Sequence, residues 1–147
     1  MNMLIGLFCR RHLRLRTINI SQMCLNIFVN LSNHSITDWS ETQRGAARVL
    51  APELMDLQFP YVDPEMALGD LETRVEELIQ YELPEGVTHA MVQGEFTMTV
   101  LLVKALQNKG IQCYAATTMR ISHDEGAGLK RSAFRFVQFR EYPGNPN

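Results

Sequence analysis

Three short groups of polar residues stand where apolar runs of the chain end, and their side chains are of types that bind phosphates and sugars. The first group ends "CLNIFVNLS", the second follows "HAMVQ", and the third follows "IQCYAA". They are Ser32, Asn33 and His34; Gly94, Glu95 and Thr97; and Thr117, Thr118 and Arg120. Hydroxyls and a guanidinium donate hydrogen bonds to phosphate and sugar oxygens, and a histidine also moves protons near neutral pH.

Each group also has a plain structural interpretation. Gly94 would let a ligand approach the amides at a helix start, or it would only form a tight turn with Thr97 as the helix cap. Glu95 would hydrogen-bond a ribose hydroxyl or an adenine amine, or it would place a favourable charge at a helix N-terminus. His34 is alternatively a polar loop residue. Thr117 and Thr118 are common strand residues, and Arg120 could pair with a local carboxylate.

The first half of the chain predicts a strand, a helix and a short strand. Residues 24–32 are β-branched and aromatic and indicate a buried strand. Ser40 and Gln43 have capping-box spacing, which predicts a helix from about residue 41 to residue 50. A short strand is expected over residues 54–59, with Pro60 and Pro64 forcing a loop after it.

The second half repeats the alternation. Asp70 is expected to cap a helix over "LETRVEELIQYEL", whose apolar residues recur at helical spacing. Strands are expected at residues 89–95 and 111–118, on either side of a helix over residues 97–110 that Gly110 ends. The alternating "AFRFVQFREY", residues 133–142, predicts an edge strand with one face toward solvent.

This alternation predicts an α/β fold: a small Rossmann-like or flavodoxin-like three-layer domain. Its mainly parallel sheet would have about five strands and a C-terminal edge strand. In such sheets ligands bind at the carboxyl ends of the strands, where the winding direction reverses. The three polar groups are therefore expected to converge on one crevice.

Composition limits the classes of protein. The chain has 147 residues, 46% of them hydrophobic, and no apolar run long enough to span a membrane, which indicates one globular domain. Three cysteines without metal-ligand spacing or a secretory signal favour free thiols in the cytoplasm. Residues 1–22 contain four arginines and no carboxylate, and we interpret them as a tail or a misjudged start before a domain at 23–147.

Other chemistries find little support in the sequence. There is no Gly-x-Gly-x-x-Gly, phosphate-loop lysine motif, His-Glu-x-x-His or Gly-x-Ser-x-Gly, so we expect no cofactor and no bound metal. After residue 22 the chain has 10 basic and 16 acidic residues. This balance argues against binding to long nucleic acid.

Four blocks carry a resemblance to a known family: "NLSNHSITDWSETQ", "VQGEFTMTVLLVKALQNKGI", "AATTMR" and "FRFVQFREY". In this order they resemble small Rossmann-like CRISPR-associated accessory proteins, related to CARF-type sensors and ring nucleases, over roughly residues 25–142. A closely similar set of uncharacterised bacterial proteins shares all four blocks.

The resemblance implies that the chain binds a cyclic oligoadenylate second messenger and cleaves it without a metal. His34 would transfer a proton and Arg120 would steady the phosphate. The ligand would be bound by Ser32, Asn33, Gly94, Glu95, Thr97, Thr117 and Thr118. A symmetric ring is best held by a two-fold homodimer whose pockets merge. The alternatives are a noncatalytic sensor or sponge, or a Rossmann-like protein that binds another small anion.

Overall fold

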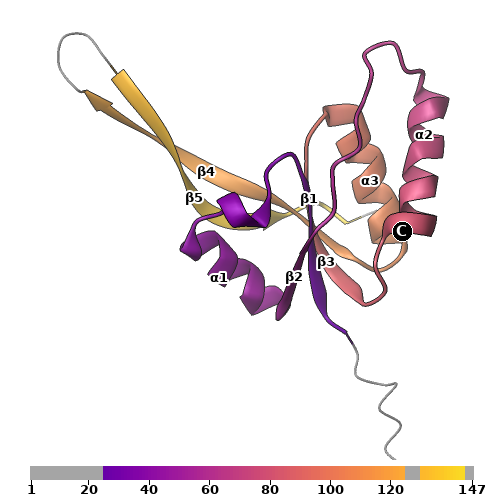
Figure 1. Ribbon diagram of the computed structural model, residues 1–147, viewed down its shortest axis with the longest axis horizontal. Helices are drawn as coiled ribbons and strands as arrows, with labels where there is room; N and C mark the ends of the chain where they lie inside the picture. Colours follow the sequence, from indigo (N-terminus) through magenta and orange to yellow (C-terminus); the bar gives the residue numbers. More distant parts are fainter. Residues whose placement is uncertain (1–24, 125–129, 145–147) are drawn as a thin grey trace, which may run out of the picture.

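The most buried strand is β1 (Ile27–Ser32), whose first five residues are all buried. It is the second strand of a five-stranded sheet in the computed structural model, which describes residues 25–124 and 130–144. Helices cover both faces of the sheet (Figure 1). The basic segment 1–22 and the domain boundary expected at residue 23 lie outside the described residues.

The other elements alternate along the chain largely as the sequence predicts. In order they are η2 (Ile36–Asp38), α1 (Glu41–Leu50), β2 (Glu53–Asp56), α2 (Leu68–Glu77), η3 (Leu78–Glu82), β3 (Val87–Gln93), α3 (Phe96–Asn108), β4 (Gln112–Asp124) and β5 (Lys130–Glu141). Here η2 is a single 3-10 turn and η3 is a π-helical turn that continues α2.

The strand order in the sheet is β2-β1-β3-β4-β5. The first four strands are parallel and β5 is antiparallel to β4, so the expected mainly parallel sheet with a C-terminal edge strand is confirmed. The chain winds outward from β1 to β2 and then crosses back to β3. The reversal of winding therefore falls between β1 and β3.

Two apolar cores fill the space between the sheet and its helices. One core joins α1 to the sheet through Phe28, Trp39, Ala47 and Tyr114. The other lies on the opposite face, where residues of α2 and α3 such as Leu71 and Leu102 pack on Val29, Leu31 and Val92. This gives the predicted three layers, and β1 contributes to both cores because it alternates side chains between the faces.

The helix caps agree with the sequence in two cases and differ in one. The backbone N–H of Gln43 donates to the Ser40 hydroxyl at 3.2 Å, and Gly110 ends α3 with a φ of 79°. The expectation that Asp70 is the N-cap of the next helix was wrong, because α2 begins at Leu68. Asp70 instead lies within the first turn and accepts a hydrogen bond from Ala67 N at 3.1 Å.

The limits of the strands were predicted less well than their existence: β3 runs from Val87 to Gln93 where residues 89–95 were expected, and β5 begins at Lys130 where residue 133 was expected. The short strand expected at residues 54–59 is β2, which ends at Asp56, where its pairing with β1 also ends. The strand expected at residues 111–118 is β4, which continues to Asp124. It does so because β5 pairs with it from Tyr114 and Glu141 as far as Asp124 and Lys130. Local sequence does not encode such a pairing.

None of the helices in the described part of the chain is both long enough and apolar enough to cross a membrane.

Candidate functional site

A crevice of about 450 Å³ opens at the carboxyl ends of β1 and β3, at the point where the winding of the sheet reverses. Parts of the chain that are far apart in sequence line it: the turn after β1, the start of α1, the end of β3, and the β4–β5 hairpin. The lining residues are Ser32, Asn33, His34, Asp38, Trp39, Gln43, Met91, Gln93, Gly94, Ala116, Thr118 and Phe134. Its size lies within the range of about 300–1,000 Å³ that is typical of small-molecule sites.

The turn after β1 is held by two polar residues that the sequence analysis did not select. Asn30 is 2% exposed, and its side-chain amide donates to the backbone oxygen of His34 and to Asp56 Oδ1, both at 2.7 Å. The Asp56 carboxylate also accepts from the Ser35 hydroxyl at 2.7 Å and from Ile36 N at 3.0 Å. These bonds fix the backbone that carries Asn33 and His34 into the crevice.

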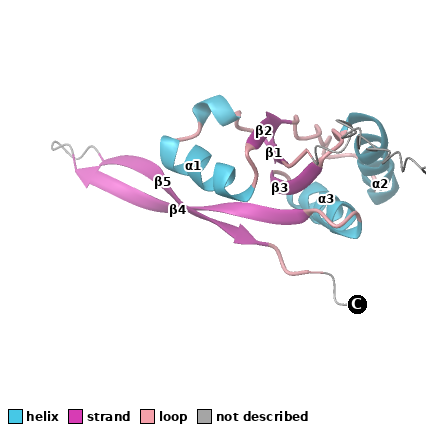
Figure 2. Cartoon of the chain, turned by 90° about the horizontal axis from the view of Figure 1, so that it is seen from below, coloured by secondary structure: helices cyan, strands magenta, loops and turns pink. Residues whose placement is uncertain are grey.

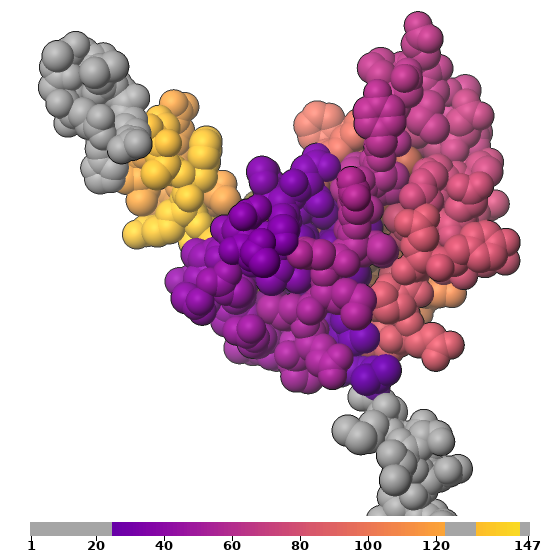
Figure 3. Space-filling model, in the orientation of Figure 1, coloured from indigo at the N-terminus to yellow at the C-terminus, as the bar shows by residue number. Residues whose placement is uncertain are grey.

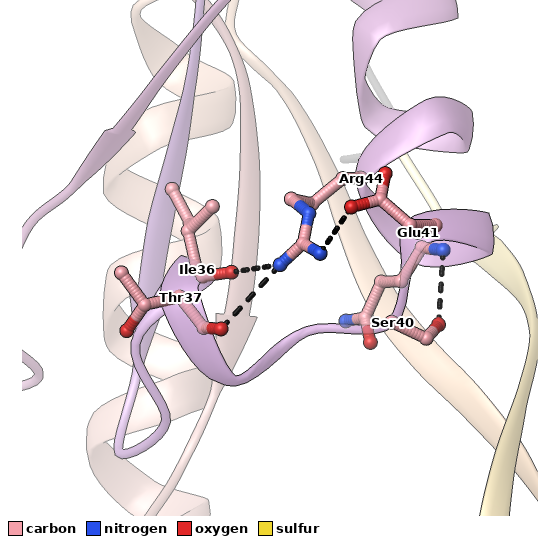
Figure 4. Close-up of polar contacts among 6 residues, drawn as sticks. Ile36, Thr37, Ser40, Glu41 and Arg44 are labelled. Carbon is pink, nitrogen blue, oxygen red and sulfur yellow. Dashed lines mark hydrogen bonds and ion pairs between the residues drawn. The ribbon is translucent and has the colours of Figure 1, made fainter.

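The next wall is built where η2 meets α1 (Figure 4). The guanidinium of Arg44 donates to the backbone oxygens of Ile36 at 3.2 Å and Thr37 at 3.4 Å, and it pairs with Glu41 at 2.6 Å. One side chain of α1 therefore clamps the 3-10 turn against its own helix. These contacts of Arg44 set the positions of Asp38 in the 3-10 turn and Gln43 in α1, and both residues line the crevice.

The third wall is the end of β3. Gln93 Oε1 accepts from Ala116 N at 3.1 Å, which ties β3 to β4 beyond their last ladder pair and leaves the Gln93 amide hydrogens available. Gly94 follows, and a Cβ at this position would lie 2.5 Å from Cζ of Phe59, a side chain that is only 5% exposed. The glycine is thus required by packing, whatever the crevice binds.

Glu95 acts as the N-cap of α3. Its carboxylate accepts from Met98 N at 2.7 Å and from Thr97 N at 3.0 Å. These backbone hydrogen bonds lower the pKa of Glu95 below its usual value. The amides that the sequence analysis considered as an anion site are therefore occupied by the chain's own carboxylate, which favours the structural interpretation of Glu95.

The fourth wall comes from the β4–β5 hairpin. Thr118 and Phe134 line the crevice, and Phe134 is 70% exposed. Arg120 is the ladder partner of Phe134 and lies two residues beyond Thr118, so it shares the face of the strand that Thr118 presents to the crevice. Its guanidinium donates to the Ser132 hydroxyl at 2.9 and 3.0 Å. The Thr117 hydroxyl instead donates to Gln138 O at 3.1 Å.

Five of the nine predicted site residues line the crevice: Ser32, Asn33, His34, Gly94 and Thr118. The other four, Glu95, Thr97, Thr117 and Arg120, lie beside it. Sequence reasoning did not select Asp38, Gln43, Gln93 or Phe134. Gln93 could have been found, because it stands near the end of a predicted strand, directly before Gly94. Phe134 gave no such signal, because it fits the apolar alternation of the predicted edge strand.

The chemistry of the lining is mostly neutral and amide-rich. It offers three carboxamides, two hydroxyls, one imidazole, one carboxylate and an exposed phenyl ring, and no lysine or arginine is among the lining residues in the described part of the chain. In the same described part, no group of three or more histidine, cysteine or acidic side chains could hold a metal ion. The crevice is thus suited to an uncharged heterocycle, and the guanidinium of Arg120 lies beside it on the hairpin.

Residues 26–140 match the model of the Uncharacterized protein MJ1673 family. The chain belongs to this family. The MJ1673-family match spans the sheet from before β1 to Arg140 in β5, and therefore includes every residue that lines the crevice. No curated protein and no solved structure matched the chain.

Proposed function

We propose that this MJ1673-family protein binds a cyclic oligoadenylate in the crevice at the carboxyl ends of β1 and β3 and cleaves it without a metal. The observation that carries the proposal is the convergence of Asn33, Gln93 and Phe134 on one crevice at the reversal of the winding. In folds of this topology that edge is where nucleotides bind.

Adenine recognition is the best-supported step. Unstacked bases are commonly bound by stacking on an aromatic ring and by hydrogen bonds to their polar edges. Phe134 provides an exposed ring, and the amides of Asn33, Gln43 and Gln93 provide both donors and acceptors. Because the Gln93 oxygen is already bonded to Ala116 N, its NH₂ group would donate to a ring nitrogen.

Phosphate recognition would depend on Arg120 and the neighbouring hydroxyls. The Arg120 side chain would exchange its bonds to Ser132 for a bidentate contact with a phosphate, which is a stronger, charge-assisted interaction. Thr118 and Ser32 would donate from the crevice wall. Glu95 and Thr97 would contribute indirectly, by fixing the start of α3 beside Gly94.

Cleavage would use the ring's own hydroxyl as the nucleophile. A ribose 2′-oxygen attacks the adjacent phosphorus, a P–O2′ bond forms, and the P–O5′ bond breaks to leave a 2′,3′-cyclic phosphate. His34 would accept the 2′-hydroxyl proton and then release it to water, and the 5′-oxygen would take up a proton from water and leave as a hydroxyl. Arg120 would stabilise the charge on the phosphate, so the protein mainly positions the reacting atoms.

A homodimer would match the size of the proposed ligand. A crevice of about 450 Å³ suits one nucleotide rather than a ring of several. A homodimer in which two crevices merge across a two-fold axis would hold a symmetric ring. In the alternative of a noncatalytic sponge, the same residues would bind the ring and His34 would transfer no proton. A protein that binds another small anion would use only some of these residues.

The test is incubation of the full chain with cyclic tri-, tetra- and hexa-adenylate in EDTA, with products resolved by chromatography and binding measured by calorimetry. Arg120→Ala and His34→Ala are compared with Arg48→Ala, an exposed arginine on α1 outside the crevice. Linear products that only the first two variants lose would support the nuclease. Binding of intact rings would indicate a sponge, and absence of binding at every ring size would refute the proposal.

A further inference from the structure

The β4–β5 hairpin projects from the body of the molecule as an arm (Figures 1 and 2). β3 pairs with β4 only from Gln112 to Tyr114, whereas β4 and β5 pair as far as Asp124 and Lys130. We use "the arm" for residues 118–124 of β4 and 130–137 of β5. In the space-filling view its described part extends away from the body and meets it at the base of the arm (Figure 3).

The arm exposes apolar side chains that its own chain does not cover. Met119 is 51% exposed and Val137 48%, on the face of the hairpin that also carries Arg135, whereas Phe134, 70% exposed, lies on the opposite face with Arg120. A two-stranded ribbon is at best marginally stable in water unless further structure packs on it. Apolar groups gathered on such a projecting element therefore indicate an interaction surface.

Charge is divided unequally between the hairpin and the body. Residues 112–141 contain five lysines or arginines and three carboxylates, whereas residues 25–111 contain five basic residues and thirteen carboxylates. Arg135 is exposed on the same face of the arm as Met119, to whose sulfur it donates at 3.9 Å. The arm thus offers a cation beside an apolar side chain.

A hollow of complementary chemistry lies between α2 and α3. It has a volume of about 350 Å³ and is lined by Glu72 and Glu76 on α2 and by Leu101 and Ala105 on α3. Val75 lies at its floor and Lys104 on the α3 wall, so its acidic side is the α2 side. We call it the α2–α3 hollow.

The arm lies on one side of the molecule, and helices α2 and α3, whose residues line the hollow, lie on the other side in both ribbon views (Figures 1 and 2). One copy cannot bring them together without unfolding the sheet. We propose that the arm docks in the α2–α3 hollow of a second copy, with Arg135 at the partner's acidic wall and Met119 against its apolar wall. In a two-fold dimer both contacts form at once.

Docking would also place the second copy next to the crevice, since Phe134 belongs to both the arm and the crevice wall. The proposal does not rest on the ligand, because it uses only the shape and charge of the chain. It would stand even if no cyclic oligoadenylate bound.

Charge reversal tests the docking in the full chain. Sedimentation velocity would compare the wild-type chain with an arm variant, Arg135→Glu, and a hollow variant, Glu72→Lys/Glu76→Lys. We expect the wild type to dimerise and each variant to dimerise at least about tenfold more weakly. An equimolar mixture of the two variants should recover the dimer, because opposite charges then meet at both contacts. Arg48→Glu, an exposed reversal on α1, should behave as wild type.

Three results would overturn the proposal. The first is a wild-type chain that stays monomeric at the highest soluble concentration. The second is a hollow variant that dimerises as well as the wild type, since the dimer would then use another surface. The third is a mixture that stays monomeric although circular dichroism shows both variants folded. Arg120 and His34 are unchanged throughout, so the outcome is separate from that of the ring-cleavage assay.

Discussion

The side-chain amide of Asn30 donates a 2.7 Å hydrogen bond to Oδ1 of Asp56, and this bond links a buried residue of β1 to the end of β2. The same carboxylate accepts from Ser35 and Ile36 in the turn that borders the crevice. The position of His34 therefore depends on a residue 22 places later in the chain.

Replacing Asp56 with alanine should loosen that turn. A buried amide hydrogen of Asn30 would lose its acceptor, at a cost of roughly 1–3 kcal/mol in the free energy of unfolding. Urea denaturation would measure the loss. Asp56→Asn keeps an acceptor for Asn30 and should lie between alanine and wild type. Equal stability of all three proteins would show that the turn does not depend on this carboxylate.

Gly94→Ala should destabilise the fold because the new methyl group would meet the Phe59 ring at 2.5 Å. We expect about 1–3 kcal/mol, the usual cost of overpacking a core. Phe59→Leu gives the matched test. In a double-mutant cycle the alanine should cost less in the leucine background, because the obstructing ring is gone. Additive costs would mean that Gly94 is required for another reason.

The Glu95 cap should make stability depend on pH. Its pKa is lowered in the folded protein by the bonds from Met98 N and Thr97 N, so the cap stabilises the fold above the unfolded value of about 4.3 and is lost as the pH falls through the folded pKa. The melting temperature of Glu95→Ala should therefore be lower than that of the wild type at pH 7 and approach it in acid. Aspartate is also favoured at N-caps, so Glu95→Asp should have a melting temperature close to that of the wild type at pH 7. A gap between wild type and Glu95→Ala that does not change with pH would contradict this role.

Phe134→Ala should weaken binding of the proposed ligand with little effect on folding, since the side chain is 70% exposed. Stacking of one base on an aromatic ring contributes about 1–3 kcal/mol, which corresponds to a roughly 5- to 150-fold loss of affinity. Phe96→Ala is the matched control, because Phe96 is 86% exposed and does not line the crevice. If both variants bound the ring as tightly as wild type, Phe134 would not be the stacking residue.

The Cys113 thiol should not react in the native protein. Burial raises its pKa to about 12, so almost no thiolate forms near neutral pH. Iodoacetamide labelling at pH 7.5, followed by mass spectrometry of the Cys113 peptide, should show modification only after denaturation. Rapid labelling of the native chain would mean that β4 opens readily.

The sequence predicted the elements best where the signal was local. The Ser40 cap, the glycine that ends α3 and the alternation of strands with helices all depend on residues within a few positions of one another. These local signals were sufficient to predict the three layers, since connections between parallel strands place helices on the faces of a sheet. They also located the crevice, because the carboxyl ends of parallel strands meet at one edge.

Only the tertiary structure determined which side chains line that crevice. Glu95 and Gly94 are adjacent in sequence, yet one carboxylate is turned onto its own helix while the glycine borders the crevice and touches Phe59. Phe134 reaches the crevice because β5 pairs in register with a strand more than ten residues earlier. Sequence patterns record the period of an element and the signals at its ends. They do not record long-range strand pairing or which carboxylate of the chain accepts from the amides at a helix start, and in this protein those two factors shape the site.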